Sequence, residues 1–350
     1  MSLQNNGEVK KRIDFIDYAK FIGIFLLLIE HTGNFIDISG NASYIYLKKW
    51  ICSFHMPIFF IVYGYVSGLK VLELKDWKEY ILKQIKSLLV PYLLWAMVYS
   101  NNYGANFFLG IAYGTNASLG YAQTNQVLWF LPTMFISTLL YQLVLNFLKR
   151  AKNNIVLIIL VITIGIFVAS ISTKVQGLRL PFGIDISFLG LSFMLIGNFL
   201  IKPTMKYIET LNKIKAGWIL IFMCSLIIGI FISIYNAPVN KTYWVTVMAV
   251  GEYGKNVVLF FDGAIINSIA ILLICNHIKN NVLLYLGQHT LIIMGVHYIL
   301  FPFTLHITVE ILRNINYSVL IAILNSLFTI ILCIPISYLV DKFCPCLNGK

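Results

Sequence analysis

Apolar segments long enough to cross a lipid bilayer recur along the whole chain, and this pattern constrains the fold more than any other feature. Hydrophobic residues make up 59% of the 350 residues and charged residues 11%, whereas about 25% of an ordinary soluble domain is charged. A bilayer core needs about 20 apolar residues per helix and offers no water to unpaired backbone groups, so each segment must form a helix. We therefore predict an all-α, polytopic integral membrane protein with about ten transmembrane helices, forming a single domain over residues 1–350. The predicted segments cover residues 15–33, 52–70, 87–101, 127–147, 155–172, 183–201, 217–235, 257–275, 283–303 and 317–340.

The distribution of lysine and arginine predicts how these helices are oriented. Ten helices place both termini on one side, and with cytoplasmic termini 18 basic residues fall in the inner segments and seven in the outer ones. Since inner segments normally carry the excess, we expect the leader, 1–14, and the tail, 341–350, to be cytoplasmic. The net charge of +12 then lies mainly against anionic lipid and requires no nucleic-acid partner. The leader lacks the features of a cleavable signal peptide.

The first apolar segment carries charges that such a segment normally avoids. Lys20 and His31 are eleven residues apart, which places them on one helix face within about 20° and about 16 Å apart along the axis. Asp17 precedes Lys20 by three residues, a spacing that permits an ion pair. Charges inside a span usually face protein or a water-filled cavity. Snorkelling of Lys20 to the cytoplasmic surface is the alternative, but Glu30 and His31 lie within the apolar layer or at its outer edge.

Two further histidines are predicted at the depth of His31. His55 lies near the predicted outer end of the second segment and His297 in the outer half of the ninth, whereas His289 lies near the inner end of the ninth. Histidine can act as a general base near neutral pH, and three at one level favour a site over isolated packing residues. No HExxH pattern or close histidine pair is present, so we expect no metal site.

Two longer polar stretches fall on the predicted outer face. Residues 101–126 carry no charge and are rich in Gly, Asn and Tyr, a composition that suits either contact with a carbohydrate or simple packing over the helix ends. Residues 234–256 include an apolar run that is too short to span a bilayer. We expect that run to form an interfacial or re-entrant helix.

Six stretches of the sequence together resemble one known family. They are DFIDYAKFIGIFLLLIEHT, SFHMPIFFIVYGYVSG, KQIKSLLVPYLLW, WFLPTMF, LPFGIDISFLGLSFMLIGNFL and LGQHTLIIMGVHYIL. In order and spacing they resemble the acyltransferase 3 family, and the most similar branch is that of the fucose 4-O-acetylase-like enzymes that modify polysaccharides. The resemblance covers about residues 12–303. It implies about ten transmembrane helices, acetyl-CoA supplied from the cytoplasm, and acyl transfer to a hydroxyl of a glycan exposed on the other side.

The resemblance also implies roles for particular residues. The family's basic residue in the first helix falls on Lys20, and its essential histidine falls on His31. The histidine of its second-helix signature is His55, and the basic residues before its third helix correspond to Lys83 and Lys86. We expect the three lysines to attract the phosphates of acetyl-CoA, because an ammonium group is an effective point charge for phosphate. His31 would act as general base on the acceptor hydroxyl or accept the acetyl group and relay it.

Three positions depart from the family pattern. Phe21 and Glu30 stand where glycines are usual, and Tyr63 stands where serine is usual. The bulk of Phe21 and the charge of Glu30 are expected to affect the acyl passage or the choice of acceptor.

The remaining site residues are assigned around His31. Either Glu30 or His55 would orient His31 and stabilise its cation, as the third member of a catalytic triad does. Trp129, Tyr63 and His297 are assigned to acceptor binding, the first two as neighbours of the developing oxyanion.

A transporter or flippase for a lipid-linked sugar or a small solute is the alternative function, and a membrane sensor or scaffold is a second one. Transporters often show inverted repeats, and the charged first segment has no counterpart among segments six to ten. The favoured prediction is therefore an O-acetyltransferase of the cell membrane, in a bacterial plasma membrane, that uses acetyl-CoA and no metal. Its partners would be the glycan acceptor and membrane lipids, and a homo-oligomer is compatible with the sequence.

Overall fold

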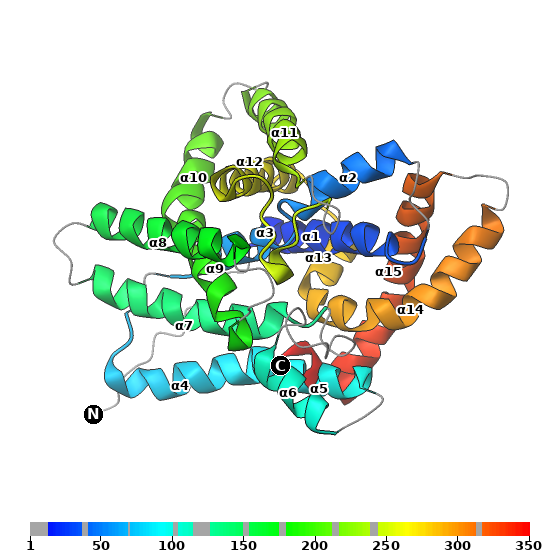
Figure 1. Cartoon of the computed structure of the whole chain (residues 1–350), viewed down its shortest axis with the longest axis horizontal. Helices are drawn as coiled ribbons and strands as arrows, with labels where there is room; N and C mark the ends of the chain where they lie inside the picture. The colour runs from blue at the N-terminus through cyan, green and yellow to red at the C-terminus, as the bar shows by residue number, and fades with distance from the viewer. Residues whose placement is uncertain are drawn as a thin grey trace.

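The computed structural model describes most of the chain, and the described part is almost entirely helical (Figure 1). It covers residues 13–36, 41–68, 71–100, 104–114, 127–149, 154–174, 180–211, 217–238, 244–312 and 317–350. Within these ranges there is no β-strand, and one isolated antiparallel bridge joins Val247 to Glu252. The predicted all-α class is confirmed.

Nine helical stretches in the described ranges are long and apolar enough to cross a membrane. The first five comprise α2 (Ala42–Cys52) with α3 (Pro57–Val66); α4 (Leu74–Gln84), η1 (Ile85–Leu89) and α5 (Val90–Tyr99); α7 (Phe130–Leu148); α8 (Asn154–Lys174); and η2 (Pro181–Gly183), α9 (Ile184–Ile196), η3 (Gly197–Ile201) and most of α10 (Lys202–Leu211). The other four are α11 (Gly217–Asn236), α12 (Val257–Cys275), α14 (Thr290–Ile311) and α15 (Ser318–Phe343).

Helix α1 (Asp14–Thr32) corresponds to the first predicted segment. Its 19 residues are the length of a span, but it carries Asp14, Asp17, Lys20 and Glu30, which keep it out of the nine apolar stretches. Together these stretches follow the predicted segments in order, so the chain is a multi-pass membrane protein. Two short helices, α6 (Ala105–Tyr113) and α13 (Asn281–Gln288), lie between spans, and η5 (Pro345–Asn348) follows the last one.

Several boundaries differ from the prediction. The second span runs over Ala42–Val66 rather than 52–70, so Lys48 and Lys49 lie inside it and His55 lies near its middle, at a break between α2 and α3. The ninth span is α14 alone, because α13 ends before His289, and His297 therefore lies in the first half of this span. Hydropathy misplaced the start of the second span because Lys48 and Lys49 look like loop residues in the sequence.

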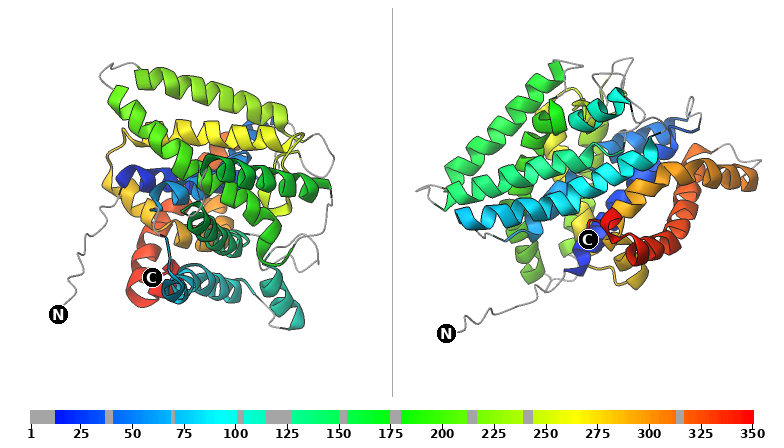
Figure 2. Two further views of the ribbon diagram at one scale, coloured as in Figure 1. Left: turned by 90° about the vertical axis from the view of Figure 1, so that its left-hand side faces the viewer. Right: turned by 90° about the horizontal axis from the view of Figure 1, so that it is seen from below.

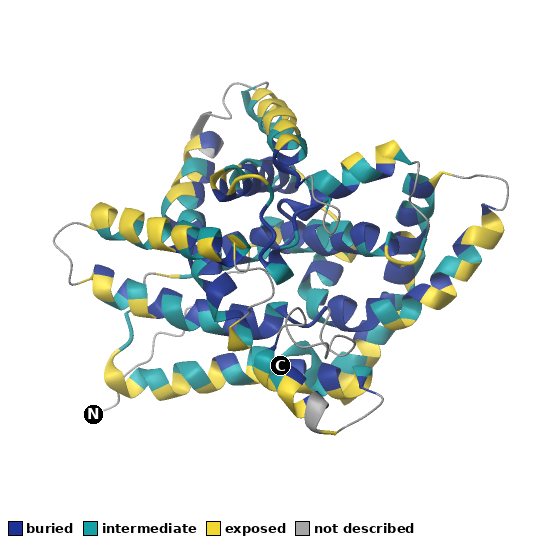
Figure 3. Ribbon diagram, viewed as in Figure 1, coloured by how far each residue is buried: buried dark blue, intermediate teal, exposed yellow. Residues whose placement is uncertain are grey.

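Helix α1 lies in the middle of the bundle, and helices distant in sequence surround it (Figures 1 and 2). It packs against α3, α12, α13, α14 and α15. The contact with α13 is close because Gly287 faces the backbone of Asp17; a Cβ at position 287 would lie 1.9 Å from the Asp17 carbonyl oxygen. Figure 3 shows α1 as largely buried. The charged first segment is thus shielded from lipid by its neighbours.

The outermost helices show the reverse pattern. Only 17% of the apolar window of α8 and 11% of that of α11 are buried inside the protein, and their exposed residues are mainly large and apolar (Figure 3). In a bilayer such side chains meet acyl chains rather than water, so this surface is the expected lipid contact.

Candidate functional site

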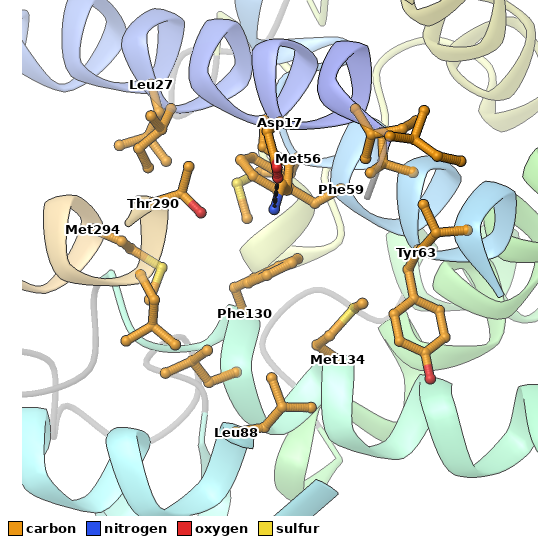
Figure 4. A pocket seen from close by; sticks show the side chains of 18 of the residues that line it. Asp17, Leu27, Met56, Phe59, Tyr63, Leu88, Phe130, Met134, Thr290 and Met294 are labelled. Carbon is orange, nitrogen blue, oxygen red and sulfur yellow. Dashed lines mark ion pairs between the residues drawn. The ribbon is translucent and has the colours of Figure 1, made fainter. Parts of the chain in front are cut away.

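Two adjoining cavities lie beside α1 in the described part of the structure. The first, here called the lysine cavity, has a volume of about 510 Å³ (Figure 4). It is lined by Ile13, Ile16, Asp17, Lys20, Ile24, Leu27, Met56, Phe59, Val62, Tyr63, Val66, Leu88, Phe130, Leu131, Met134, Lys202, Thr290, Leu291 and Met294. The second, the histidine cavity, has a volume of about 360 Å³ and contains Glu30, His31 and His55 in its lining. Leu27 and Met56 line both, so the cavities meet at this pair.

The lysine cavity is an apolar space with a few charges in its wall. Lys20 Nζ lies 2.5 Å from Asp17 Oδ1, the pair marked by a dashed line in Figure 4, so the ion pair predicted from their spacing is confirmed. Lys202 is a second basic residue of the lining, whereas Phe59 and Phe130 represent its mainly apolar surface. The wall thus carries two ammonium groups and one carboxylate.

Two π-helical segments shape this wall. Leu88 lies within η1, and Lys202 directly follows η3. A π-helical turn changes the helical phase of the residues that follow, and such turns are frequent at functional sites. Lys202 is not among the predicted site residues, because a lysine at a predicted helix end looks like a surface charge. Lys83 and Lys86, which were predicted to bind acetyl-CoA, are exposed and do not line the cavity.

His31 is held in the histidine cavity by His297. His297 Nδ1 lies 2.7 Å from the Met294 carbonyl oxygen and donates its proton there. With both rings neutral, His297 Nε2 accepts the hydrogen bond from His31 Nδ1, at 2.8 Å. The remaining nitrogen of His31, Nε2, is then the basic one.

A buried ion pair faces that basic nitrogen. Glu30 Oε2 lies 3.2 Å from His31 Nε2, and Glu30 Oε1 lies 2.9 Å from Lys48 Nζ. Lys48 also donates to Asn34 Oδ1 at 3.2 Å, and Asn34 Nδ2 donates to the Tyr298 hydroxyl at 3.0 Å. The Glu30 carboxylate is therefore fixed by Lys48 where it stabilises a proton taken up by His31.

The broken second span positions His55. Its Nδ1 donates to the Ile51 carbonyl oxygen at 2.9 Å, and Pro57 begins α3 two residues later. This leaves Nε2 of the neutral ring as an acceptor. Both histidines line the same cavity, as predicted, but in the described structure the side chains in polar contact with the ring nitrogens of His31 are Glu30 and His297 rather than His55. Of the two predicted orienting residues, the geometry supports Glu30.

The end of α1 that carries His31 is fixed by a buried polar network. Asn325 Nδ2 on α15 donates to the Thr32 hydroxyl at 2.9 Å, and Thr304 on α14 donates to Asn325 Oδ1 at 2.7 Å. The Thr304 and Thr329 hydroxyls are 3.0 Å apart. In an apolar bundle these bonds fix the relative positions of three helices, and hence the site of His31 relative to His297 on α14.

The segment Trp244–Val250 covers the histidine cavity, and all seven of its residues line it. We expected a short helix here. The described part of this stretch instead has irregular backbone, with the Val247–Glu252 bridge and one 3₁₀ turn, η4 (Met248–Val250). The predicted helix is wrong there, because the backbone N–H and C=O of Val247 pair with those of Glu252 instead of forming helical hydrogen bonds.

Comparison with known proteins decides the family. A family model described as an acyltransferase domain, Acyl_transf_3, matches residues 13–341. The chain belongs to the acyltransferase 3 family. No curated protein and no solved structure matches it. The family assignment made from the six sequence motifs is thus confirmed, and it extends over nearly the whole chain.

The remaining site predictions for this acyltransferase divide between the two cavities. Trp129 lines the histidine cavity together with His31, as expected of a residue near the reacting groups. Tyr63 lines the lysine cavity, and its hydroxyl lies 3.3 Å from that of Tyr80. Tyr63 therefore lines a different cavity from His31, and its role beside an oxyanion stays a prediction.

His289, which is predicted at the other end of its span from His297, makes a separate contact. Its Nε2 lies 2.7 Å from Asp341 Oδ2 on α15.

Most of the polar loop 101–126 lies outside the described residues, apart from 104–114 with α6. In the described ranges, no group of three His, Cys, Asp or Glu residues is arranged to hold a metal ion.

Proposed function

We propose that this membrane acyltransferase transfers an acetyl group from cytoplasmic acetyl-CoA to a hydroxyl of a cell-surface or exported polysaccharide, or of its lipid-linked precursor. One observation carries the proposal: the cavity with two lysines and the cavity that holds His31 meet at Leu27 and Met56. A charged, water-soluble thioester and a separate acceptor need such an arrangement, with anion-binding groups at one end and a base at the other.

The lysine cavity suits the donor. Lys20 and Lys202 offer positive charge for the phosphates of acetyl-CoA, and the mainly apolar wall suits the slender pantetheine arm. Asp17 holds Lys20 in place through their ion pair. The acetyl group at the end of the arm would then reach the junction at Leu27 and enter the histidine cavity. Lys83 and Lys86 remain candidates for attracting the nucleotide at the surface, as exposed charges do.

The histidine cavity suits proton transfer from the acceptor. His31 Nε2 takes the proton of the acceptor hydroxyl while that oxygen attacks the thioester carbonyl carbon. Glu30 stabilises the imidazolium that forms, and His297 holds the ring in the required tautomer. The carbon–sulfur bond then breaks, the thiolate of CoA takes the proton from His31, and the products are an O-acetyl ester and CoA.

A relay in which His31 Nε2 first carries the acetyl group uses the same atom and releases CoA earlier. If the reaction with labelled acetyl-CoA is stopped with acid, the protein itself should carry the label only if this relay operates.

The walls of the histidine cavity are consistent with a sugar acceptor. Trp129, Trp244 and Tyr298 supply aromatic surface, and Asn34 and His55 supply hydrogen-bonding groups. Ligand sites commonly combine a mainly apolar surface with a few such polar groups.

The test uses membranes containing the protein, labelled acetyl-CoA, and polysaccharide purified from cells that lack the gene. Wild-type membranes should release CoA and transfer the label to the polysaccharide. His31→Ala should lower the transfer rate by about 10²–10⁴, the usual contribution of a general base. Lys20→Ala should mainly raise the KM for acetyl-CoA, and Lys20→Arg should retain much of the activity.

His306→Ala is the matched control, because His306 is exposed on α14 and lines neither cavity. It should be as active as the wild type at equal protein level. Normal transfer by His31→Ala would refute the catalytic role, and absence of CoA release from the wild type would favour the transporter.

A further inference from the structure

The segment Trp244–Val250 is an irregular stretch of backbone between α11 and α12, and it lines the histidine cavity. Buried backbone groups must find partners within the protein. Here Val247 exchanges both its backbone hydrogen bonds with Glu252, at 2.7 and 3.1 Å. Asn236, at the end of α11, donates to the Tyr253 carbonyl oxygen at 2.8 Å and accepts from the Asn256 backbone N–H at 2.8 Å. The segment is therefore held in a defined position between α11 and α12.

One side chain of this segment has an unmet hydrogen-bonding requirement. Thr246 is 4% exposed, and its hydroxyl has no hydrogen-bond partner among the described residues. Burying an unpaired hydroxyl costs free energy. Most threonines elsewhere in the helices avoid this by donating to a carbonyl one turn back, as Thr133 does to Trp129. The two described residues before Thr246, Trp244 and Val245, are not helical, and Thr246 lines the histidine cavity.

We propose that the Thr246 hydroxyl is an acceptor-binding group that sets the specificity of the transfer. This inference rests on the proposed function. The hydroxyl would bind a polar group of the acceptor next to the reacting hydroxyl, such as a neighbouring hydroxyl of a sugar ring, since an alcohol can both donate and accept. A site that leaves a buried polar group unpaired without the correct substrate discriminates strongly against acceptors that lack the matching group. The cost of the unpaired hydroxyl is removed only when such an acceptor binds.

The experiment compares Thr246→Val with the wild type in the same transfer assay, using the polysaccharide from gene-deleted cells as acceptor. Valine keeps the shape and removes the hydroxyl. The KM for the polysaccharide should rise about tenfold, the equivalent of one lost hydrogen bond. The KM for acetyl-CoA should not change, and the thermal unfolding temperature should stay the same or increase. Thr246→Ser keeps the hydroxyl and should keep the wild-type KM.

Ser268→Ala is the matched control. Ser268 on α12 is also fully buried with a hydroxyl that lacks a partner in the described structure, but it lines neither cavity. Its removal should leave both KM values unchanged. An unchanged polysaccharide KM in Thr246→Val, or a lower unfolding temperature without a change in KM, would overturn the proposal. A wild type that transfers no label would instead refute the proposed function on which it rests.

Discussion

The Glu30–Lys48 pair is the least expected feature at the scale of single residues. Both side chains are about nine-tenths buried, and both lie within membrane-spanning helices. A charge in such a place is expensive unless it is paired, which explains why the two occur together. The sequence predicted that Glu30 acts beside His31, but Lys48 looked like one of the basic residues of an outer loop. Only the folding of α2 against α1 shows that Lys48 is the counter-ion.

Lys48→Met tests this pair. The substitution leaves the Glu30 carboxylate buried without its cation, so the free energy of unfolding should fall by about 3–5 kcal/mol. The double variant Lys48→Met with Glu30→Gln should recover most of the stability, because both charges are removed. It should transfer acetyl groups slowly, since the imidazolium of His31 loses its carboxylate. Thermal unfolding in detergent and the labelled acetyl-CoA assay measure the two effects.

Lys49→Met is the control for the Lys48 experiment. Lys49 lies one position further along α2 and lines neither cavity. It should change stability and activity little. A Lys48→Met protein as stable as the wild type would show that the pair is not needed to hold Glu30.

At the scale of elements, close helix contacts depend on glycine at particular positions. Gly64 on α3 faces the backbone of α9, where an added Cβ would lie 1.9 Å from the Met194 carbonyl oxygen. Gly197 at the start of η3 faces α3 in the same way, with an added Cβ 2.1 Å from the Ile61 carbonyl oxygen. Small residues at helix crossings let membrane helices approach closely. This contact places α3 and η3 together at the lysine cavity, where Val62 and Lys202 line the wall.

Gly64→Ala should therefore separate α3 from α9. Because the added methyl group meets backbone rather than a movable side chain, we expect a loss of about 1–3 kcal/mol, typical of overpacking. Thermal unfolding in detergent checks this value. Gly217→Ala is the control, since no atom lies within 4 Å of the added Cβ on α11. Equal unfolding temperatures for the two variants would contradict the close contact.

The elements themselves were largely predictable from hydropathy. Hydropathy located the nine apolar spans of the described residues, because an apolar run of sufficient length has few alternatives to a helix. The interruptions were not found: the break that carries His55, the two π-helical segments, and the irregular stretch Trp244–Val250. Each departs from the regular backbone bonding of an α-helix while keeping apolar residues, and hydropathy does not report that bonding.

At the scale of the whole molecule, the junction between the cavities is the feature on which the proposed function depends. Leu27→Trp would place a larger side chain at that junction, while Lys20 and His31 remain in place. Acetyl-CoA should still bind, but transfer to the polysaccharide should fall by at least about tenfold, because the acetyl group is held short of the base. Equilibrium binding of labelled acetyl-CoA and the transfer assay measure the two steps separately.

Ile227→Trp provides the control for bulk. Ile227 lies on α11 with 61% of its surface exposed, on the side expected to face lipid. This variant should keep wild-type transfer. Full transfer by Leu27→Trp would mean that the acetyl group does not pass between the cavities.

Local sequence was enough to establish the class of this protein: a helical, multi-pass membrane protein of a known family, with a first helix that carries Lys20 and His31. These conclusions follow from short-range properties, namely hydropathy, helical spacing and motif order. Tertiary structure alone decided which groups meet. It joined His31 to His297, paired Glu30 with Lys48, put Lys202 rather than Lys83 and Lys86 in the cavity wall, and placed Thr246 in the histidine cavity. Such contacts depend on how distant helices pack, because a buried charge or hydroxyl is tolerated only where another part of the chain, or a substrate, supplies its partner.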